Sequence, residues 1–342
     1  MRRSDLLGQG ELLDADGTLS ESGYAFSQVK SYDRNSIRAR KSRIKEWDSY
    51  YFCDEKFAVA LTIARGAHTS LASASLIDFE HIRYIAKSKI GPNGKSKLVM
   101  PNSCSSGSVR IEKGDAEITF MTGDDGARRI DAEIERFFKK DTFRCSIELD
   151  PYCGDNITCA IPFDKSNRFC YDTKINCLKG KGRFELGDKE YFFDNGMGGF
   201  DWCRGVLPRK NRRYRASLSC ALDDGTPFGL NLGYGFGMPT ASENAIFFDG
   251  KANKLKEVNF DIPFTLDMPD YLKPWKICDG DGRLEMIFYP MVDDHEKTHA
   301  FRFALERHRV FGKFYGKATL DDGKLVAVTD RIGFAEFVAT KW

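Results

Sequence analysis

Two histidines four residues apart, His295 and His299, lie in the pentapeptide HEKTH, which has the spacing of a zinc-peptidase motif. In those enzymes the motif lies on a helix, so that both imidazoles point at one ion. Here Asp293 and Asp294 precede the motif and the alternating stretch AFRFAL follows it. This context indicates a loop beside a strand, in which the two rings point in unrelated directions. His308 lies nine residues past His299, which is not a familiar spacing for a third ligand. We therefore predict no metal site.

Two carboxylates, Asp201 and Glu243, are flanked by apolar and aromatic residues. Burial in such surroundings disfavours the ionised form, which would raise a carboxyl pKa toward the range of a general acid. Arg204, three residues after Asp201, could hold a carboxylate in its ionised form. Asp201 and Glu243 are our candidate catalytic residues. The alternative is structural, because a buried Asp–Arg pair often satisfies backbone groups where strands meet.

Residues close to these acids could bind a ligand. Asn231, between two leucines, could project a neutral hydrogen-bonding group into a lumen. Aromatic rings could line a cavity or stabilise a developing cation. The candidate ligand-binding residues are Trp202, Arg204, Asn231, Tyr234, Phe236 and Asn244.

Two further stretches resemble ligand motifs. The run RKNRRYR, residues 209–215, could bind phosphates, although a solvated loop leading into a strand explains it as well. The run GYGFG, residues 233–237, lacks the final spacing of a dinucleotide fingerprint and does not open a helix. Its glycines more often mark a bulge or a close approach. We predict no cofactor.

The elements that must position these residues are strands. Asp-Gly pairs recur beside runs that alternate apolar and polar residues, which is a strong hairpin signal. The clearest hairpin joins 214–222 to 227–234. One helix is possible, over 79–89. The pattern predicts an all-β, mostly antiparallel chain.

The length of 342 residues suggests two domains. A cysteine-rich segment, 153–177, gives way to glycine-punctuated hairpins. We therefore predict an N-terminal β lobe over 1–185 and a C-terminal β-barrel lobe over 186–342.

Net charge and hydropathy limit the classes of binding partner that we expect. The net charge of +2 creates no general field for nucleic acid, and no run of 18 apolar residues suggests membrane insertion. The basic start has no apolar segment behind it, so we expect a cytoplasmic protein. None of the ten cysteines forms a C-x-x-C pair, which favours reduced thiols over zinc ribbons or thioredoxin-like sites.

A series of short motifs resembles a known family. The motifs are LDADGTL at 13–19, KEW at 45–47, DWCRG at 201–205, GLNLG at 229–233, EN at 243–244 and KL at 254–255. Nearly end to end, the chain is similar to the bacterial domain-of-unknown-function family 2804. That family is distantly similar to calycin-like proteins, which include lipocalins and carotenoid hydratases. The resemblance implies two calycin- or lipocalin-like antiparallel lobes, barrel or sandwich, with an apolar cavity.

Three functions follow as hypotheses. The first is binding of a hydrophobic small molecule, isoprenoid- or acyl-like, in a β-barrel cavity. The second is an enzyme of the same fold, a hydratase, isomerase or cyclase that uses a cavity acid. The third is an interaction protein that acts through the basic loop at 209–215. Fold analogy alone does not decide between them.

Overall fold

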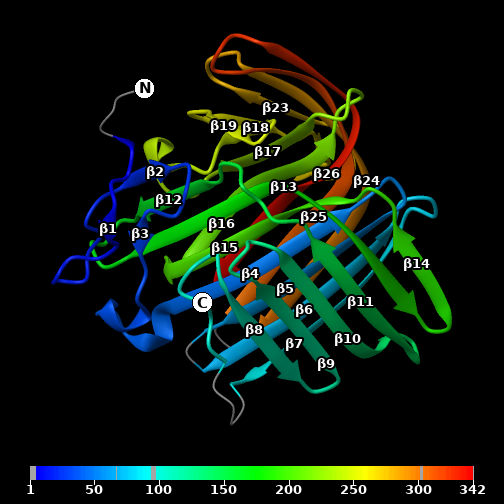
Figure 1. Ribbon diagram of the computed structural model, residues 1–342, viewed down its shortest axis with the longest axis horizontal. Coiled ribbons are helices and arrows are strands. Elements are labelled where there is room, and N and C mark those ends of the chain that lie inside the picture. The colour runs from blue at the N-terminus through cyan, green and yellow to red at the C-terminus, as the bar shows by residue number, and fades with distance from the viewer. Residues whose placement is uncertain (1–4, 67, 94–97, 301–302, 342) are drawn as a thin grey trace.

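The computed structural model describes residues 5–66, 68–93, 98–300 and 303–341, and nearly all of its regular structure is antiparallel β-sheet (Figure 1). Short 3-10 turns occur at Arg34–Ser36, Lys41–Arg43 and Pro239–Ala241. The prediction of an all-β chain with two lobes is confirmed.

The larger sheet contains the N-terminal strands and curls into a nearly closed barrel. Its strands are β2 (Gly23–Ala25), β4 (Ile44–Cys53), β5 (Phe57–Arg65), β6 (Thr69–Asp78), β7 (Arg83–Pro92), β8 (Gly107–Lys113), β9 (Ala116–Thr122), β10 (Arg128–Phe138), β11 (Asp141–Leu149), β12 (Ile157–Pro162), β13 (Phe169–Leu186), β14 (Lys189–Phe193) and β15 (Met197–Val206). The main order is β7-β6-β5-β4-β15-β13-β11-β10-β9-β8. Beside this path, β12 pairs with β13 and β2, and β14 pairs with β13.

Side chains bridge the gap between the two ends of this sheet. Lys87 and Lys89 of β7 lie 3.2 and 2.9 Å from carboxylate oxygens of Asp115, in the turn between β8 and β9. Lys87 also donates to the carbonyls of Glu135 and Arg136, at the end of β10. The barrel is thus closed on this side by lysine contacts rather than by a strand ladder.

The smaller sheet is a half-barrel of the C-terminal strands. Its strands are β16 (Lys210–Ala221), β17 (Pro227–Tyr234), β18 (Ala245–Phe248), β19 (Lys251–Lys254), β20 (Val258–Asp261), β23 (Trp275–Asp279), β24 (Leu284–Ala300), β25 (Phe303–Thr319) and β26 (Leu325–Lys341). They are ordered β19-β18-β17-β16-β26-β25-β24-β23-β20. Two small pairs, β1 (Gly10–Glu11) with β3 (Lys30–Ser31) and β21 (Phe264–Thr265) with β22 (Met268–Pro269), lie outside both sheets. The predicted hairpin around residues 222–227 is β16 and β17.

Strand alternation gives β4, β13 and β15 two differently used faces, because successive side chains point to opposite sides. On β15, Phe200 and Trp202 belong to the apolar core inside the larger barrel, whereas Cys203 belongs to another cluster on the outside. On β4, Tyr50 points inward and Tyr51 outward in the same way. The outward faces are largely buried as well over the stretches on which the half-barrel packs, which include residues 169–178 of β13.

Two apolar clusters join the lobes. The first includes Cys159, Cys170, Cys203, Ala245 and Phe247, with Trp47 and Phe236 packed against it. The second includes Tyr51, Phe79, Val292, Phe311 and Phe334. Asp201 lies opposite Ser49, which stands between Trp47 and Tyr51 on β4. A polar strip therefore separates the two apolar clusters.

The arrangement of strands differs from the sequence-based interpretation at residues 79–89 and at the division between the lobes. Residues 79–89 form a turn and the start of β7 rather than a helix, because ten consecutive pairs with β6 override the weak helical pattern. Residues 186–206, assigned to the C-terminal lobe, lie largely in strands of the larger sheet, and the sheets change over between Val206 and Lys210. We therefore propose residues 207–209 as the division between the lobes.

Candidate functional site

A buried lysine lies at the centre of a group of carboxylates between the lobes. Lys174 Nζ lies 2.6 Å from a carboxylate oxygen of Asp172, 2.6 Å from one of Asp201 and 3.2 Å from one of Glu243. Asp172 and Lys174 are on the outward face of β13, and Asp201 is on the neighbouring strand β15. Glu243 comes from the half-barrel, between β17 and β18. Both lobes therefore build this site.

Arg215, on β16, supplies a second buried cation. Its guanidinium lies 2.7 Å from a carboxylate oxygen of Asp201 and 3.7 Å from one of Glu243. Farther along, Glu336 lies 4.0 Å from Arg215 and 2.7 Å from Arg309. We call Asp172, Lys174, Asp201, Arg215 and Glu243 the inter-lobe cluster. It has three acids and two permanent cations, so protonation of one acid would balance its charge.

The pKa directions differ among the three acids of the inter-lobe cluster. Burial, opposed by Lys174 and reinforced by the neighbouring carboxylates, raises the pKa of Asp172 to about 7. Burial also acts on Asp201, but Arg215 and Lys174 outweigh it and hold its pKa well below the usual range. The pKa of Glu243 is lowered in the same way, since Lys174 and Arg215 together overcome the effect of burial. The expectation that burial would raise the pKa of Asp201 and Glu243 is therefore wrong, because two cations face them.

Glu243 is held in place by residues that the sequence analysis named. Asn231 Nδ2 donates to the carbonyl of Glu243 over 3.1 Å. Asn244 Oδ1 accepts a 2.6 Å hydrogen bond from the Gly233 N–H, and its Nδ2 donates to the carbonyl of Lys256. A Cβ at Gly233 would lie 2.5 Å from a Glu243 carboxylate oxygen, so a larger residue there would displace that carboxylate. Asn231 and Asn244 thus fix the backbone around the acid.

Aromatic rings and one arginine cover the outer side of the inter-lobe cluster. Trp47 Nε1 donates to Asp201 over 3.1 Å. The Arg213 guanidinium lies over the rings of both Trp47 and Phe236, 5.5 and 5.2 Å from their centroids. Phe236 in turn meets Phe163 edge to face at 5.1 Å. These partly buried residues connect the cluster to the surface.

Phe163 also lines an open hollow of about 640 Å³. We call this the basic hollow; its lining residues are Phe163, Asp164, Arg168, Pro208, Arg209, Lys210 and Lys341. Much of the run at 209–215, interpreted as a loop, is the start of β16. Its side chains therefore alternate, so that Arg215 is buried in the inter-lobe cluster while Arg212 is exposed.

Trp202 and Arg204 lie away from the inter-lobe cluster, inside the larger barrel. Arg204 pairs with Asp48 at 2.7 Å and lies over the Trp202 ring at 4.3 Å. The expected partnership of Arg204 with Asp201 is wrong, because residues three apart on a strand face opposite sides. Trp202 contacts the ring of Tyr171 edge to face at 5.6 Å.

The remaining predicted aromatic residues are also separated. Phe236 lies at the outer side of the inter-lobe cluster, as described above. Tyr234 is 51% exposed, and its ring lies 6.4 Å from that of Tyr214, on the opposite face of β17 from Asn231. The structure thus brings Asp201, Glu243, Asn231, Asn244 and Phe236 together, and places Trp202, Arg204 and Tyr234 elsewhere.

Three members of the inter-lobe cluster were missed from sequence: Asp172, Lys174 and Arg215. A usable signal exists for the first two, which are the charged residues inside the otherwise mostly apolar run FCYDTKINCL at 169–178. Charges inside a strand that is buried on both faces must find partners. Arg215 was hidden in a basic run whose other members are largely exposed.

The HEKTH residues lie within β24 and not in a loop. Residues four apart on a strand are separated by about 13 Å, since each residue advances about 3.3 Å. His295 and His299 therefore cannot share an ion from this one strand, and the absence of a metal at that pair stays a prediction.

Comparison with protein families and solved structures agrees with this architecture. The profile of the domain of unknown function DUF2804 matches residues 4–342. The chain belongs to the DUF2804 family. Among curated proteins, none matches it significantly.

Two solved structures resemble this DUF2804 chain in fold. A provisionally named ATTH of Nitrosomonas europaea has a TM-score of 0.55 and 15% identity, over 91% of this chain and 98% of its own. Kievitone hydratase from Nectria haematococca has a TM-score of 0.48 and 9% identity, over 92% of this chain and 96% of its own. The first shows that this chain shares its overall fold with a solved structure over nearly the whole of both chains. No helix in the described ranges is long and apolar enough to cross a bilayer.

Proposed function

We propose that this protein binds a small, largely hydrophobic molecule that carries an acidic group, in the basic hollow at the outer side of the inter-lobe cluster. The observation that carries this proposal is the juxtaposition of an aromatic ring and several cations there. Phe163 and Pro208 offer apolar surface, while Arg168, Arg209 and Lys210 offer positive charge. The volume of about 640 Å³ is within the range of small-molecule sites.

The interior of the larger barrel is less suited to a ligand than the family resemblance implies. Large side chains, including Phe52, Phe143, Phe169, Tyr171 and Trp202, belong to one continuous core cluster there. Protein interiors packed in this way leave little room beyond water-sized voids. This favours a site between the lobes over one inside the barrel.

The lining of the basic hollow favours an anionic group on the ligand. Its cations are Arg168, Arg209, Lys210 and Lys341, against one acid, Asp164. Asp164 pairs with Arg168 at 3.1 Å. Guanidinium groups bind carboxylate or phosphate through paired hydrogen bonds, which specifies planar or tetrahedral anions over neutral groups.

Two fluorescent probes test this assignment: anilinonaphthalene sulfonate, which is aromatic and anionic, and phenylnaphthylamine, its uncharged relative. We expect saturable binding of the sulfonate by the wild type. The double change Arg209→Ala and Lys210→Ala should weaken it about 10-fold or more, because a charge-assisted contact is worth about 1.5–3 kcal/mol. The uncharged probe should be affected much less.

The matched control changes Lys181 and Arg183, two exposed cations on β13, to alanine. This variant should bind the sulfonate like the wild type. Absence of saturable binding in the wild type, or equal binding by the Arg209/Lys210 double variant, would contradict the proposal. Native mass spectrometry of the purified protein then identifies any molecule that it retains.

A second candidate, an acid–base enzyme of the same fold, is favoured by the different pKa directions within the inter-lobe cluster. Asp172, with a pKa of about 7, and the ionised Asp201 contact the same Lys174 ammonium. Acid–base chemistry uses such separated pKa values. Asp201, the more exposed of the two, is the group that would meet a substrate.

Incubation of a retained molecule with the protein distinguishes binding from catalysis. Hydration would add one water to its mass, whereas isomerisation or cyclisation would change its retention time at constant mass. Asp201→Asn should abolish that conversion while the sulfonate probe still binds. Conversion at the wild-type rate by this variant would exclude Asp201 as the acid or base.

A further inference from the structure

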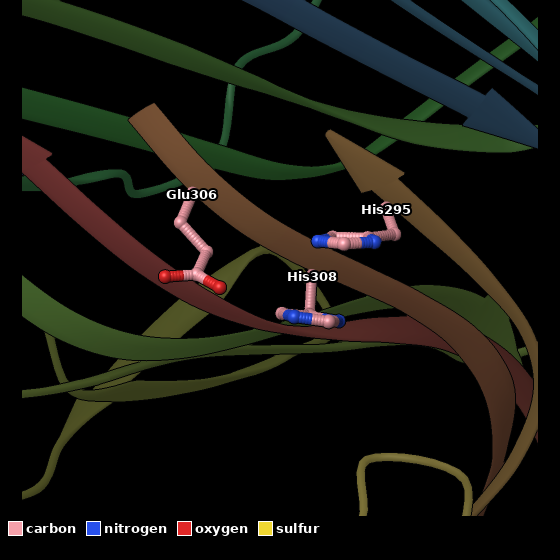
Figure 2. Close-up of side chains that lie close together, drawn as sticks. All are labelled: His295, Glu306 and His308. Carbon is pink, nitrogen blue, oxygen red and sulfur yellow. The ribbon is translucent and has the colours of Figure 1, made fainter. Parts of the chain in front are cut away.

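A separate group of side chains on the half-barrel has the composition of a transition-metal site. Antiparallel pairing of β24 and β25 sets His295 opposite His308, and Glu306 lies two residues before His308 on the same face. Figure 2 shows the carboxylate of Glu306 turned toward the two rings. One possible ligand atom from each side chain lies within 4.8 Å of those of the other two. None of the three belongs to the inter-lobe cluster or lines the basic hollow.

His308 is already oriented for a metal. Its Nδ1 lies 2.7 Å from Oδ2 of Asp293, and its ring stacks on Tyr271 with the centroids 4.1 Å apart. A carboxylate that accepts the Nδ1–H leaves Nε2 available for coordination. Histidine ligands of metals usually have such a partner on the other nitrogen. The ring is therefore held by contacts that a binding site would need.

His295 is the adjustable member of the group. Its ring stacks on His308 with a centroid distance of 4.1 Å and an interplanar angle of 9°. Parallel rings cannot both aim an in-plane lone pair at one ion, so one ring must turn. His295 is exposed, whereas the ring of His308 stacks on Tyr271 and its Nδ1 lies 2.7 Å from Asp293 Oδ2, so His295 is the ring that turns. Ligand atoms of tetrahedral zinc lie about 3.4 Å apart, so the required movement is small.

Glu306 can serve as the third ligand with little loss of free energy. Its carboxylate lies 3.3 Å from Lys297 Nζ, and both side chains are about half exposed. Such exposed ion pairs contribute little free energy, so a metal ion can displace the lysine. Two imidazoles and one carboxylate suit zinc and its first-row neighbours.

We propose that His295, Glu306 and His308 bind one divalent transition-metal ion, with zinc the best match. Three protein ligands leave one coordination position open. An adjoining hollow of about 360 Å³, lined in part by Glu306, His299 and Arg212, gives water or an anion access to that position. This assignment is independent of the proposed function. The two histidines of the proposed site, His295 and His308, are therefore brought together by the pairing of β24 with β25 and not by the four-residue spacing in HEKTH.

Calorimetric titration of tag-free, metal-free protein with zinc chloride tests the proposal, and cobalt chloride provides a visible spectrum of the same site. We expect one ion per chain. His295→Ala and His308→Ala should each weaken binding at least about 100-fold, and Asp293→Asn about 10- to 100-fold. The matched control is His81→Ala, which removes an exposed histidine from the turn between β6 and β7, in the other lobe, and should leave the affinity unchanged. His299→Ala, which changes only the lining of the adjoining hollow, should weaken binding much less than His295→Ala does.

Circular dichroism of each variant separates loss of the metal from loss of the fold. His295→Ala is the decisive variant, because an exposed ring can be removed without disturbing the core. The proposal is overturned if the wild type binds no stoichiometric zinc, or if His295→Ala and His308→Ala bind it as tightly as the wild type. Equal losses in His299→Ala and His295→Ala would also overturn it, since they would assign the ion to the HEKTH pair.

Discussion

Where the half-barrel packs on β4, β13 and β15, the outer faces of these strands are largely buried, as their inner faces are, yet the two faces differ in chemistry. The inner face contributes Tyr50, Ile175 and Trp202 to a continuous apolar core. The outer face places Lys174 and Asp201 among further charges, between two apolar clusters. The same strands therefore serve as a barrel wall on one side and as a docking surface on the other.

The inner face mainly contributes to the stability of the fold, and the outer face mainly to the specificity with which the lobes dock. Apolar burial inside the barrel contributes about 25 cal/mol per Å² and tolerates many similar packings. A buried charge cluster gains little net free energy, because desolvation offsets the attraction between its members. A docking of the lobes that separated Glu243 or Arg215 from Lys174 and Asp201 would leave buried charges with fewer partners. We propose that the inter-lobe cluster fixes how the lobes meet, while the apolar surfaces hold them together.

The largest effect is expected for Lys174→Met. This change leaves Asp172, Asp201 and Glu243 buried without their shared cation and should lower the free energy of unfolding by about 3–5 kcal/mol. Urea denaturation monitored by fluorescence measures it. Lys179→Met, at an exposed position of the same strand, is the control and should change stability by less than about 0.5 kcal/mol. Similar small losses for both variants would show that the outer face does not depend on its charges.

A smaller loss, about 1–3 kcal/mol, is expected for Asp201→Asn. Asparagine can still accept from Trp47 Nε1, but it no longer neutralises Lys174 and Arg215. Thermal melts give the change, and probe binding in the basic hollow is measured on the same sample. A wild-type melting temperature would mean that Asp201 has no structural role.

A pH-dependent effect is expected for Asp172→Asn. The pKa of Asp172 is about 7 in the folded protein, whereas an unperturbed aspartate has a pKa of 3.8. Between these two values the folded state retains a proton that the unfolded state releases. The stabilisation that comes from the raised pKa of Asp172 is complete below about pH 4 and is lost as the pH rises through about 7. Stability of the variant relative to the wild type should therefore increase between about pH 5 and pH 8. A constant difference across that range would contradict the raised pKa.

The smallest effect is expected for Ile175→Val on the inner face, about 0.5–1.5 kcal/mol from the loss of one buried methylene. No titratable group changes, so the loss should be the same at about pH 5 and pH 8. Denaturation at both values measures it and serves as the control for Asp172→Asn. A strong pH dependence here would mean that the two faces are coupled.

Much of the fold could be predicted because it depends on local pattern. Alternation and Asp-Gly turns indicated the β16–β17 hairpin. The helix that was considered possible at 79–89 does not form, because a weak local preference is overridden by a complete strand ladder with β6. The proposed division at 207–209 differs from the predicted one at 185–186, and a composition shift does not report which strands pair.

The site was predictable only in part. Asp201 and Glu243 were recognised as acids in apolar surroundings, and the structure brings them together. Their lowered pKa values were not predictable, because Lys174 and Arg215 reach them from other strands. The error over Arg204 was avoidable, since strand parity places it opposite to Asp201.

The sequence by itself determined the β architecture and the face on which each strand residue lies, because alternation with a period of two is a property of the local backbone. It also determined that Asp172 and Lys174 needed partners, since charges in an apolar strand are costly without them. Only the tertiary structure decided which partners they have. The inter-lobe cluster joins residues up to 71 positions apart, from Asp172 to Glu243, and the His295–His308 pair depends on the register of β24 and β25. Both depend on which strands become neighbours, and that choice is made by the packing of the whole molecule.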